Sequence, residues 1–417
     1  IMKKKWQTAH LPILFLTLAP LFLQAQNGAG FETYARQHDS IFIALYEKRD
    51  TQGFRLLLAD WESAYAQLDA RERKRFASDR ANAHYNLACT YALCGRREPA
   101  LDHLQQAVEA GFTDYSHLLG DTDLESLRHE PRFMALAESI RAVGDYLFIL
   151  RHAAAYNPAD ARARPAFRYD SADKPELKAL REKYRLDSVA GSGNDVSQVL
   201  NVLHWVHDLI PHDGEHGNPQ QHNAQAMIEA CRGGKRGLNC RGLATVLNEC
   251  YLSLGFASRL VTCLPKDSLG IDPDCHVINI VFVPSLGKWI WVDPTYDAWL
   301  MNEKGELLDI AEVRERIILD QPLLLNPTAN WNHRYSPDKT EYLYQYMAKN
   351  LYILQCPVES AWDLETPARG KTIQYVQLLP LDYFKQEPVV REYTDPESGV
   401  TYKFYNTNNP VSFWKHP

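Results

Sequence analysis

The sequence contains no Cys-x-x-Cys pair and no excess of basic residues. Its eight cysteines therefore indicate neither a metal ribbon nor a small disulfide-dense domain. The formal net charge is −7, from 45 basic and 52 acidic side chains, which argues against binding to a phosphate backbone. We expect no nucleic acid partner, and nothing in the sequence indicates a cofactor or a committed metal site.

Long hydrophobic runs are also missing from most of the chain. After the N-terminus, no stretch approaches the roughly eighteen uninterrupted apolar residues of a transmembrane helix. Residues 1–25 include three lysines after Met2, the short apolar run 11–23 and then Leu23-Gln24-Ala25, the layout of a secretory signal peptide. No cysteine follows to carry a lipid anchor. We expect an exported protein, periplasmic or extracellular, without stable membrane insertion.

Composition shifts along the chain predict its domains. Residues 31–150 have almost no strand signals and predict a helical domain. Residues 151–164 are rich in Ala, Arg and Asp with a proline, which is typical of a linker. We predict a catalytic domain over 165–390 and a C-terminal extension over 391–417.

Within the helical domain, residues 83–112 carry small and large apolar side chains at the spacing of a paired-helix repeat: Leu87, Ala88, Tyr91, Ala100, Leu104 and Ala107. This segment resembles a tetratricopeptide repeat, although Phe112 replaces the closing proline and His84 the early tryptophan. One repeat cannot bury its own face, so 31–69 and 131–143 should supply flanking helices. The domain is either a docking groove for a protein or peptide, or a helical support for the catalytic domain.

Cys240 is the first candidate site residue. The apolar residues after it recur at helical spacing until Gly255, so Cys240 should lie in the first turn of a helix. Unpaired N–H groups and the helix dipole favour a thiolate there. A small buried residue at a helix start is the alternative interpretation of Cys240 alone.

His276 and Asp293 complete the candidate triad. Residues 275–296 predict two strands joined by a Pro-Ser-Leu-Gly turn. If Phe282 pairs with Gly287, then His276 and Asp293 lie directly opposite each other, with Cβ atoms about 5 Å apart. Taken singly, His276 would be a core histidine and Asp293 a turn residue.

These three residues carry a family resemblance. Residues 199–312, and most clearly GLNCRGLA, DCHVINIVF and WIWVDPTYDAWL, resemble the transglutaminase-like superfamily. The resemblance implies an α+β fold with a papain-like core and an antiparallel sheet, here preceded by an all-α repeat-like domain. It also implies that Cys240 is the nucleophile, His276 the general base and acid, and Asp293 the orienting carboxylate. The family's Gly-x-Cys approach has one extra residue here.

Five histidines between positions 204 and 222 raise two alternatives, a transition-metal site or the lining of a cleft, of which we favour the cleft: His204, His207, His212, His216 and His222. The backbone N–H of Cys240 should be one oxyanion donor, and Trp205 is a candidate for the second. The tyrosine-rich segment 341–354, a predicted helix, should help to roof the cleft. Cys263 and Cys275 are the best candidates for a disulfide in an oxidising compartment.

The sequence therefore predicts an exported cysteine hydrolase or peptidase that acts on amide or isopeptide bonds in peptides or proteins through a thioester. A protein-crosslinking transferase and an arylamine N-acetyltransferase are less favoured alternatives, the latter because export separates it from acetyl-CoA. A catalytically silent peptide-binding adaptor is the non-enzymatic alternative.

Overall fold

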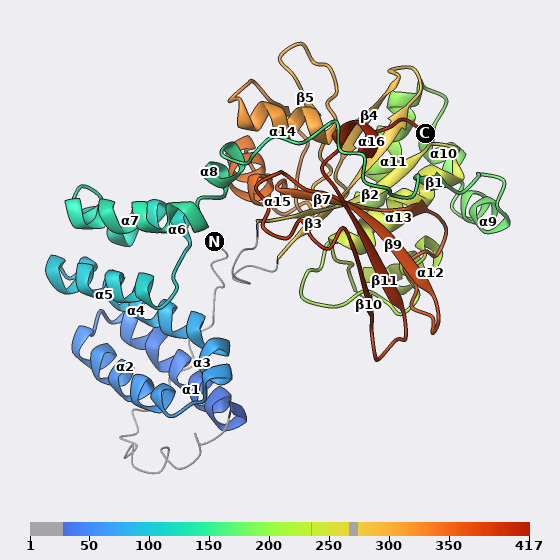
Figure 1. Ribbon diagram of the computed structural model, residues 1–417. Coiled ribbons are helices and arrows are strands. Elements are labelled where there is room, and N and C mark those ends of the chain that lie inside the picture. Colours follow the sequence, from blue (N-terminus) through green and yellow to red (C-terminus); the bar gives the residue numbers. More distant parts are fainter. Residues whose placement is uncertain (1–27, 235, 267–273) are drawn as a thin grey trace. The chain divides into compact units, whose positions relative to one another are not determined.

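The computed structural model describes residues 28–234, 236–266 and 274–417, so the predicted signal peptide lies outside the described residues. The chain divides into two compact units, with the boundary between Asp145 and Tyr146 (Figure 1). No described helix is long and apolar enough to cross a membrane.

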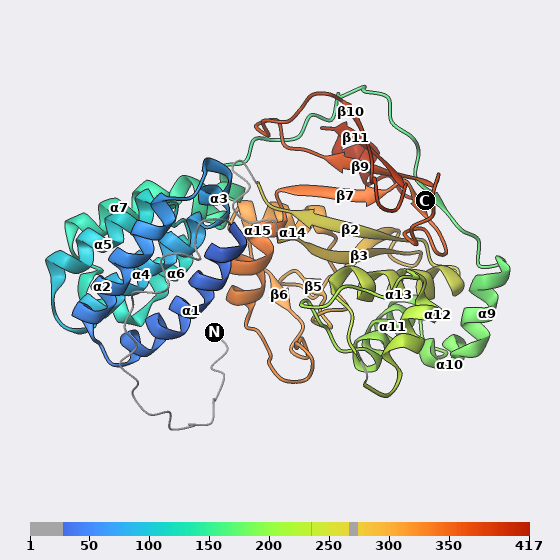
Figure 2. The ribbon, with the colours of Figure 1, turned by 90° about the horizontal axis from the view of Figure 1, so that it is seen from below.

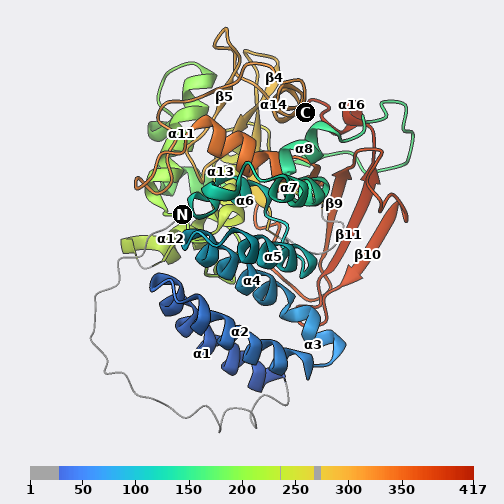
Figure 3. The same ribbon diagram turned by 90° about the vertical axis from the view of Figure 1, so that its left-hand side faces the viewer.

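Within its described residues, the first unit is built from helices (Figure 3). They are α1 (Gly28–Glu47), α2 (Thr51–Ala66), α3 (Ala70–Arg75), α4 (Ala77–Leu93), α5 (Arg97–Glu109), α6 (Tyr115–Gly120), the 3-10 helix η2 (Thr122–Leu127) and α7 (Pro131–Gly144). The pair α4 and α5 is the predicted repeat, and its small and large apolar positions form the contact between the two helices. Leu87, Ala88, Leu104 and Ala107 are fully buried, and the helical prediction is confirmed.

A cavity of about 460 Å³ lies between α1 and α4. Phe42 and Tyr46 line it from α1, and Asp79 and Asn82 line it from α4. Protein docking on this unit stays a prediction.

The second unit is built around a seven-stranded sheet. Its strand order is β10–β11–β9–β7–β2–β3–β4. The strands are β2 (Ser258–Leu264), β3 (His276–Val283), β4 (Lys288–Val292), β7 (Ile353–Pro357), β9 (Thr372–Leu378), β10 (Val390–Thr394) and β11 (Thr401–Thr407). All neighbouring pairs are antiparallel except β11 and β9, which are parallel. The α+β class is confirmed, and the parallel pair departs from the predicted antiparallel sheet.

Helices pack on both faces of the central strands. The helices before β2 are α9 (Pro175–Lys183), α10 (Leu186–Ala190), α11 (Asp195–Leu209), α12 (Ala224–Cys231), the 3-10 helix η3 (Arg232–Gly234) and α13 (Cys240–Ser253). Of these, α13 packs against β2 and β3 (Figure 2). Side chains of α14 (Ile310–Ile318) and of the π-helix η4 (Thr340–Met347) share a core with Ile278 and Ile280 of β3. The central strands are therefore buried on both faces.

Short elements complete the unit. They are α8 (Tyr146–Arg151), the parallel pair β1 (Arg168–Tyr169) and β8 (Glu359–Ser360), the antiparallel pair β5 (Leu300–Met301) and β6 (Leu324–Leu325), α15 (Ala348–Asn350) and α16 (Pro410–Phe413).

The hairpin of β3 and β4 forms, but in a different register from the predicted one. Val283 pairs with Lys288 and Phe282 with Trp289, whereas we expected Phe282 to pair with Gly287. Gly287 has a φ of 62°, so it belongs to the turn and not to the strand. The register moves by two residues, which preserves the face of every side chain. His276 and Asp293 are therefore diagonal neighbours on one face and not directly opposed.

Segments predicted to lie outside the catalytic domain are part of this unit. The predicted linker, 151–164, has little regular structure, but Asp160 accepts a hydrogen bond from the Asn408 N–H (2.7 Å). The predicted extension, 391–417, supplies β11 and nearly all of β10 to the sheet. The sequence did not predict these two strands, because neither alternates clearly between apolar and polar side chains.

The Cys263–Cys275 disulfide does not form, and all eight cysteines are free thiols. Cys263 lies directly opposite His276 across β2 and β3, so these two side chains point to the same face. Cys275 precedes His276 by one residue, which directs its side chain to the other face.

Candidate active site

Cys240 is the first residue of α13, as predicted from the sequence. Asn239 caps this helix, because its side chain accepts a hydrogen bond from the Gly242 N–H (3.1 Å). The helix start leaves N–H groups without intrahelical partners beside the Cys240 side chain, which is partly exposed. This position favours an anionic sulfur.

His276 and Asp293 form a buried pair next to Cys240. His276 is 1% exposed and Asp293 is fully buried. The His276 Nε2–H donates to Asp293 Oδ2 over 2.8 Å. Because the partner of Nε2 is a carboxylate, Nε2 carries a proton and Nδ1 is the basic nitrogen of the neutral ring. The structure thus brings together the three residues predicted from the sequence.

The electrostatics of the site favour an ion pair. Burial opposes ionisation of the Cys240 thiol, but hydrogen bonds from His212 and His276 outweigh it and lower the pKa to about 6. Burial also opposes a charge on His276, but the charge and hydrogen bond of Asp293, with the interaction from Cys240, raise its pKa to about 10. The thiolate and imidazolium forms therefore coexist near neutral pH.

Asp293 stays ionised although it is buried. Burial would raise its pKa, but His276 and hydrogen bonds from Tyr342 and the Thr295 N–H lower it. The Tyr342 hydroxyl donates to Oδ2 over 2.7 Å, and the Thr295 N–H donates to Oδ1 over 2.8 Å. Three donors thus compensate the loss of water around this carboxylate.

Aromatic side chains from η4 cover the pair. Tyr342 and Tyr346 both come from this π-helix, and the Tyr346 hydroxyl lies 3.2 Å from His276 Nδ1. The ring of Tyr296 lies 6.1 Å from the His276 ring. The tyrosine-rich pattern predicted a helix roofing the cleft, but it did not show that Tyr342 binds Asp293.

His212 also contacts Cys240; the sequence placed it in a histidine cluster expected to line a cleft but did not connect it to Cys240. An isolated β-bridge between His212 and Leu238 places it beside the segment that leads into Cys240. The Trp331 Nε1–H donates to His212 Nδ1 over 3.1 Å. His212 Nε2 therefore carries the proton of the neutral ring, and its N–H is the group available to the Cys240 sulfur.

The backbone of His212 is fixed as well. Its N–H donates to Asn332 Oδ1 (2.6 Å), and its carbonyl accepts from Asn332 Nδ2 (2.9 Å). The imidazole is therefore held in one orientation by residues more than a hundred positions away. No local sequence signal indicates this contact.

The other histidines of the cluster have separate partners. His207 is buried and is hydrogen bonded to the Pro294 carbonyl (3.0 Å), and His204 pairs with Asp297 (2.5 Å). His216 pairs with Asp213, and His222 donates its backbone N–H to a threonine. The five histidines therefore do not converge on a metal site within the described residues. His204 and His207 instead support the turn after Asp293.

Trp205, a candidate for the second oxyanion donor, is part of the helical core. Its ring lies 6.0 Å from that of Tyr184, and it packs with the apolar side chains of α11 and α13. The packing favours a core role for Trp205, because α11 directs it into the hydrophobic cluster.

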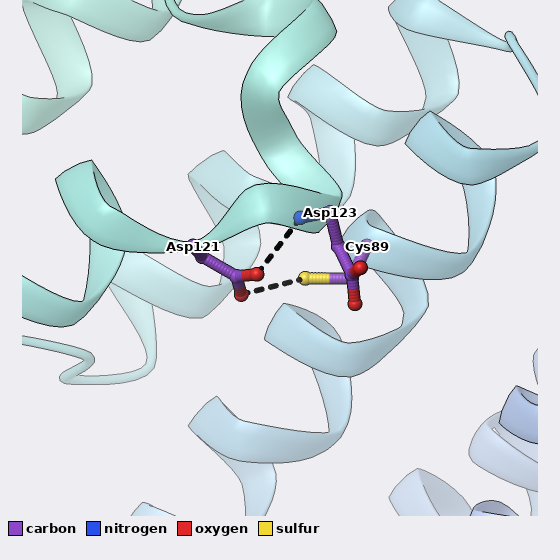
Figure 4. Close-up of side chains that lie close together, drawn as sticks. All are labelled: Cys89, Asp121 and Asp123. Atoms are coloured by element: carbon purple, nitrogen blue, oxygen red, sulfur yellow. Dashed lines mark hydrogen bonds between the residues drawn. The ribbon is translucent and has the colours of Figure 1, made fainter. Parts of the chain in front are cut away.

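One group of potential metal ligands occurs among the described residues, in the helical unit: Cys89, Asp121 and Asp123, whose ligand atoms lie within 4.8 Å of one another (Figure 4). Asp121 accepts hydrogen bonds from the Tyr85 hydroxyl (2.8 Å) and the Cys89 thiol (3.6 Å). Its other oxygen caps η2 through the Asp123 N–H (2.9 Å). Burial raises the pKa of the Cys89 thiol. These bonds give the group a structural role between α4 and η2.

Comparison with known proteins agrees with the geometry. Residues 183–294 match the sequence model of the transglutaminase-like superfamily, and this range contains Cys240, His276 and Asp293. No curated protein matches the chain significantly. A solved structure, the "Putative Cysteine Protease from Cytophaga hutchinsonii", is similar at 18% identity with a TM-score of 0.23. That alignment covers 36% of this chain and 46% of the other, so this chain spans less than half of its length. The family match supports a thiol enzyme in general.

Proposed function

Proceeding from the transglutaminase-like core at residues 183–294, we propose that the chain is an exported thiol hydrolase that cleaves amide or isopeptide bonds in peptides or proteins. Cys240 is the nucleophile, His276 the general acid and base, and Asp293 the residue that orients His276. One observation carries the proposal: the Cys240 thiol, with a pKa lowered to about 6, interacts with an imidazole that a fully buried carboxylate holds in place.

Acylation begins from the ion pair. The Cys240 thiolate attacks the carbonyl carbon, and the carbonyl oxygen becomes an oxyanion. His276 then gives its Nδ1 proton to the leaving amine as the carbon–nitrogen bond breaks. The product is a thioester on Cys240, a released amine and a neutral imidazole whose Nε2–H remains bound to Asp293.

Deacylation uses the same groups in reverse. Neutral His276 takes a proton from water through Nδ1, and the hydroxide equivalent attacks the thioester. The carbon–sulfur bond breaks, a carboxylic acid leaves, and the thiolate and imidazolium are restored. A primary amine in place of water would give transfer and crosslinking. We favour hydrolysis because water is the abundant acceptor outside a cell.

Two donors can stabilise the oxyanion. The first is the backbone N–H of Cys240 at the start of α13, and the second is the Nε2–H of His212. The Trp331 hydrogen bond fixes the neutral tautomer of His212 that presents this proton. Such a donor needs no rearrangement when the oxyanion forms, which is the basis of its effect on rate.

Thiol alkylation tests the activated nucleophile. Iodoacetamide at pH 6, followed by peptide mapping, should modify Cys240 faster than Cys94, which is an exposed thiol and serves as an internal control. Buried thiols such as Cys250 and Cys356 should stay unmodified in the native protein. Labelling of Cys240 no faster than Cys94 would contradict the proposal and favour the silent adaptor.

Substrate class requires a second experiment. Wild type and Cys240→Ala are incubated with a peptide mixture, with and without a primary amine, and the products are identified by mass. New carboxylates indicate hydrolysis, and new amides indicate transfer. Identical products from both proteins would exclude the enzymatic function.

Export is part of the proposal and rests on residues 1–25. Expression of the full chain in a bacterium with a secretory pathway should yield a protein whose N-terminus begins after Ala25. Retention of the uncleaved chain in the cytoplasm would contradict export without bearing on the thiol chemistry.

A further inference from the structure

The cavity between α1 and α4 in the helical unit has an apolar and aromatic wall. Phe42, Ile43 and Tyr46 line it from α1, and Trp61 lines it from α2. Ile43 is 60% exposed and Tyr46 is half-buried, so this wall is open to solvent. The Tyr46 hydroxyl donates to Asp123, which holds the ring in place. The wall is therefore an accessible surface that is formed before any ligand binds.

The other wall is polar, and its side chains have no partners. Asp39 lines the cavity from α1, and Asp79, Asn82 and Asn86 line it from α4. All four residues are exposed. None of their side chains makes a hydrogen bond or an ion pair within the part of the chain that the structure describes. Their carboxylates and amides are therefore free to bind a ligand.

The charge of this wall is uncompensated. No lysine or arginine is among the residues that line the cavity. Arg75 acts on Asp79 electrostatically, but it forms its ion pair with Glu32. Partial burial at the cavity wall raises the pKa of both aspartates, and the charge of Asp39 raises the pKa of Asp79 further. A positive group between the two carboxylates would be attracted to both and would relieve their repulsion.

We propose that this cavity binds a basic side chain, lysine or arginine, from an extended peptide segment of a partner protein. The charged end lies between Asp39 and Asp79. The hydrocarbon stem lies against Phe42 and Tyr46, whose rings also attract a cation. A cavity of about 150 Å³ holds benzene, so 460 Å³ has room for the side chain and for part of the backbone that carries it.

The two asparagines favour a peptide over a free amine. Asn82 and Asn86 are four residues apart on α4, so they lie on the same side of the helix. Each side-chain amide offers both a donor and an acceptor, which matches the N–H and the carbonyl of a peptide backbone. An acidic segment is disfavoured, because Asp39 and Asp79 repel it.

Surface plasmon resonance on the immobilised full chain tests the proposal. Cys240→Ala is used throughout, so that no peptide is hydrolysed at the thiol. The probes are the pentapeptide Ala-Ala-Lys-Ala-Ala, blocked at both ends, and its counterparts with norleucine or glutamate at the centre. The lysine peptide should bind at least tenfold more tightly than the norleucine peptide, because charge-assisted hydrogen bonds are the stronger ones. Butylamine should compete only at concentrations at least tenfold higher than those of the lysine peptide.

Variants locate the site. Asp39→Asn combined with Asp79→Asn should weaken binding of the lysine peptide by tenfold or more and leave the norleucine peptide unaffected. Asp39→Lys should reverse the preference, so that the glutamate peptide binds more tightly than the lysine peptide. Glu47→Gln is the matched control, since Glu47 is an exposed carboxylate of α1 that does not line the cavity. Melting temperatures should stay near that of the parent protein, because the replaced carboxylates have no partners in the described residues.

Three results would overturn the proposal. The first is a lysine peptide that binds no more tightly than the norleucine peptide, or no binding by any peptide. The second is unchanged binding in the folded double variant of Asp39 and Asp79. The third is competition by butylamine at the same concentrations as the peptide, which would indicate a site for free amines. None of these results depends on turnover at Cys240, so the thiol chemistry is tested separately.

Discussion

Replacing His212 tests the assignment of the second oxyanion donor. His212→Phe removes the N–H that faces Cys240 and keeps a ring of similar size. Loss of one such donor lowers the rate of acyl transfer by about 10²–10³-fold, or ~2.7–4 kcal/mol. We expect an effect of this order because bonds from Trp331 and Asn332 hold the imidazole in one orientation. The pKa of Cys240 should also rise above about 6, since His212 contributes to lowering it.

Two reagents separate these effects. p-Nitrophenyl acetate acylates a thiolate through an oxyanion, whereas iodoacetamide alkylates it without forming one. Both rates are measured across pH, so that the fraction of Cys240 thiolate is known for each protein. Once corrected for that fraction, acylation of His212→Phe should fall about 10²-fold, and alkylation should stay near the wild-type rate.

Further variants control for structural damage. His212→Phe leaves Trp331 Nε1 without its partner, which should cost about 1–3 kcal/mol of stability. His212→Gln retains a side-chain donor and should recover part of the acylation rate. His216→Gln, in an exposed histidine of the same loop, should react as wild type. Acylation within threefold of wild type in folded His212→Phe would refute the assignment.

Three further predictions concern the same site. Amide hydrolysis should be bell-shaped in pH, rising as the Cys240 thiol ionises near 6 and falling as the His276 imidazolium loses its proton near 10; a rate that keeps rising above 10 would contradict the role of His276 as acid. Asp293→Asn should lower turnover by up to about 10⁴-fold and lower the pKa of His276, so that the alkaline fall in the pH profile occurs at a lower pH. Gly237→Ala adds a Cβ 2.3 Å from the Pro211 carbonyl oxygen, so it should destabilise the fold by about 1–3 kcal/mol in urea unfolding. It should also slow acylation by moving His212, whereas Gly217→Ala, where a Cβ meets no atom within 4 Å, should change neither.

The local parts of this site could be predicted from the sequence. The helix that begins at Cys240 follows from apolar spacing, and the hairpin follows from its β-branched residues and turn. The register was wrong by two residues because Gly287 was placed in a strand and not in the turn. Because side chains alternate between the two faces of a strand, a shift of two residues leaves His276 and Asp293 on the same face, as predicted.

The parts set by distant contacts could not be predicted. His212 reaches Cys240 through a bridge to Leu238 and through bonds to Trp331 and Asn332, and no spacing rule connects these segments. Tyr342 belongs to a recognisable aromatic helix, but its π-helical geometry and its bond to Asp293 depend on tertiary packing. The burial of Arg314 on α14, where its Nε donates to the Leu351 carbonyl, could not be predicted either, because an arginine on an amphipathic helix normally lies at the surface.

The absence of cross-links between the eight cysteines has a practical consequence. No disulfide links the described residues, so dithiothreitol or a phosphine can be kept in every buffer without reducing a structural cross-link. Preparations that lose activity on storage should then regain it on reduction, provided that the sulfur at position 240 has gone no further than a sulfenic acid or a mixed disulfide.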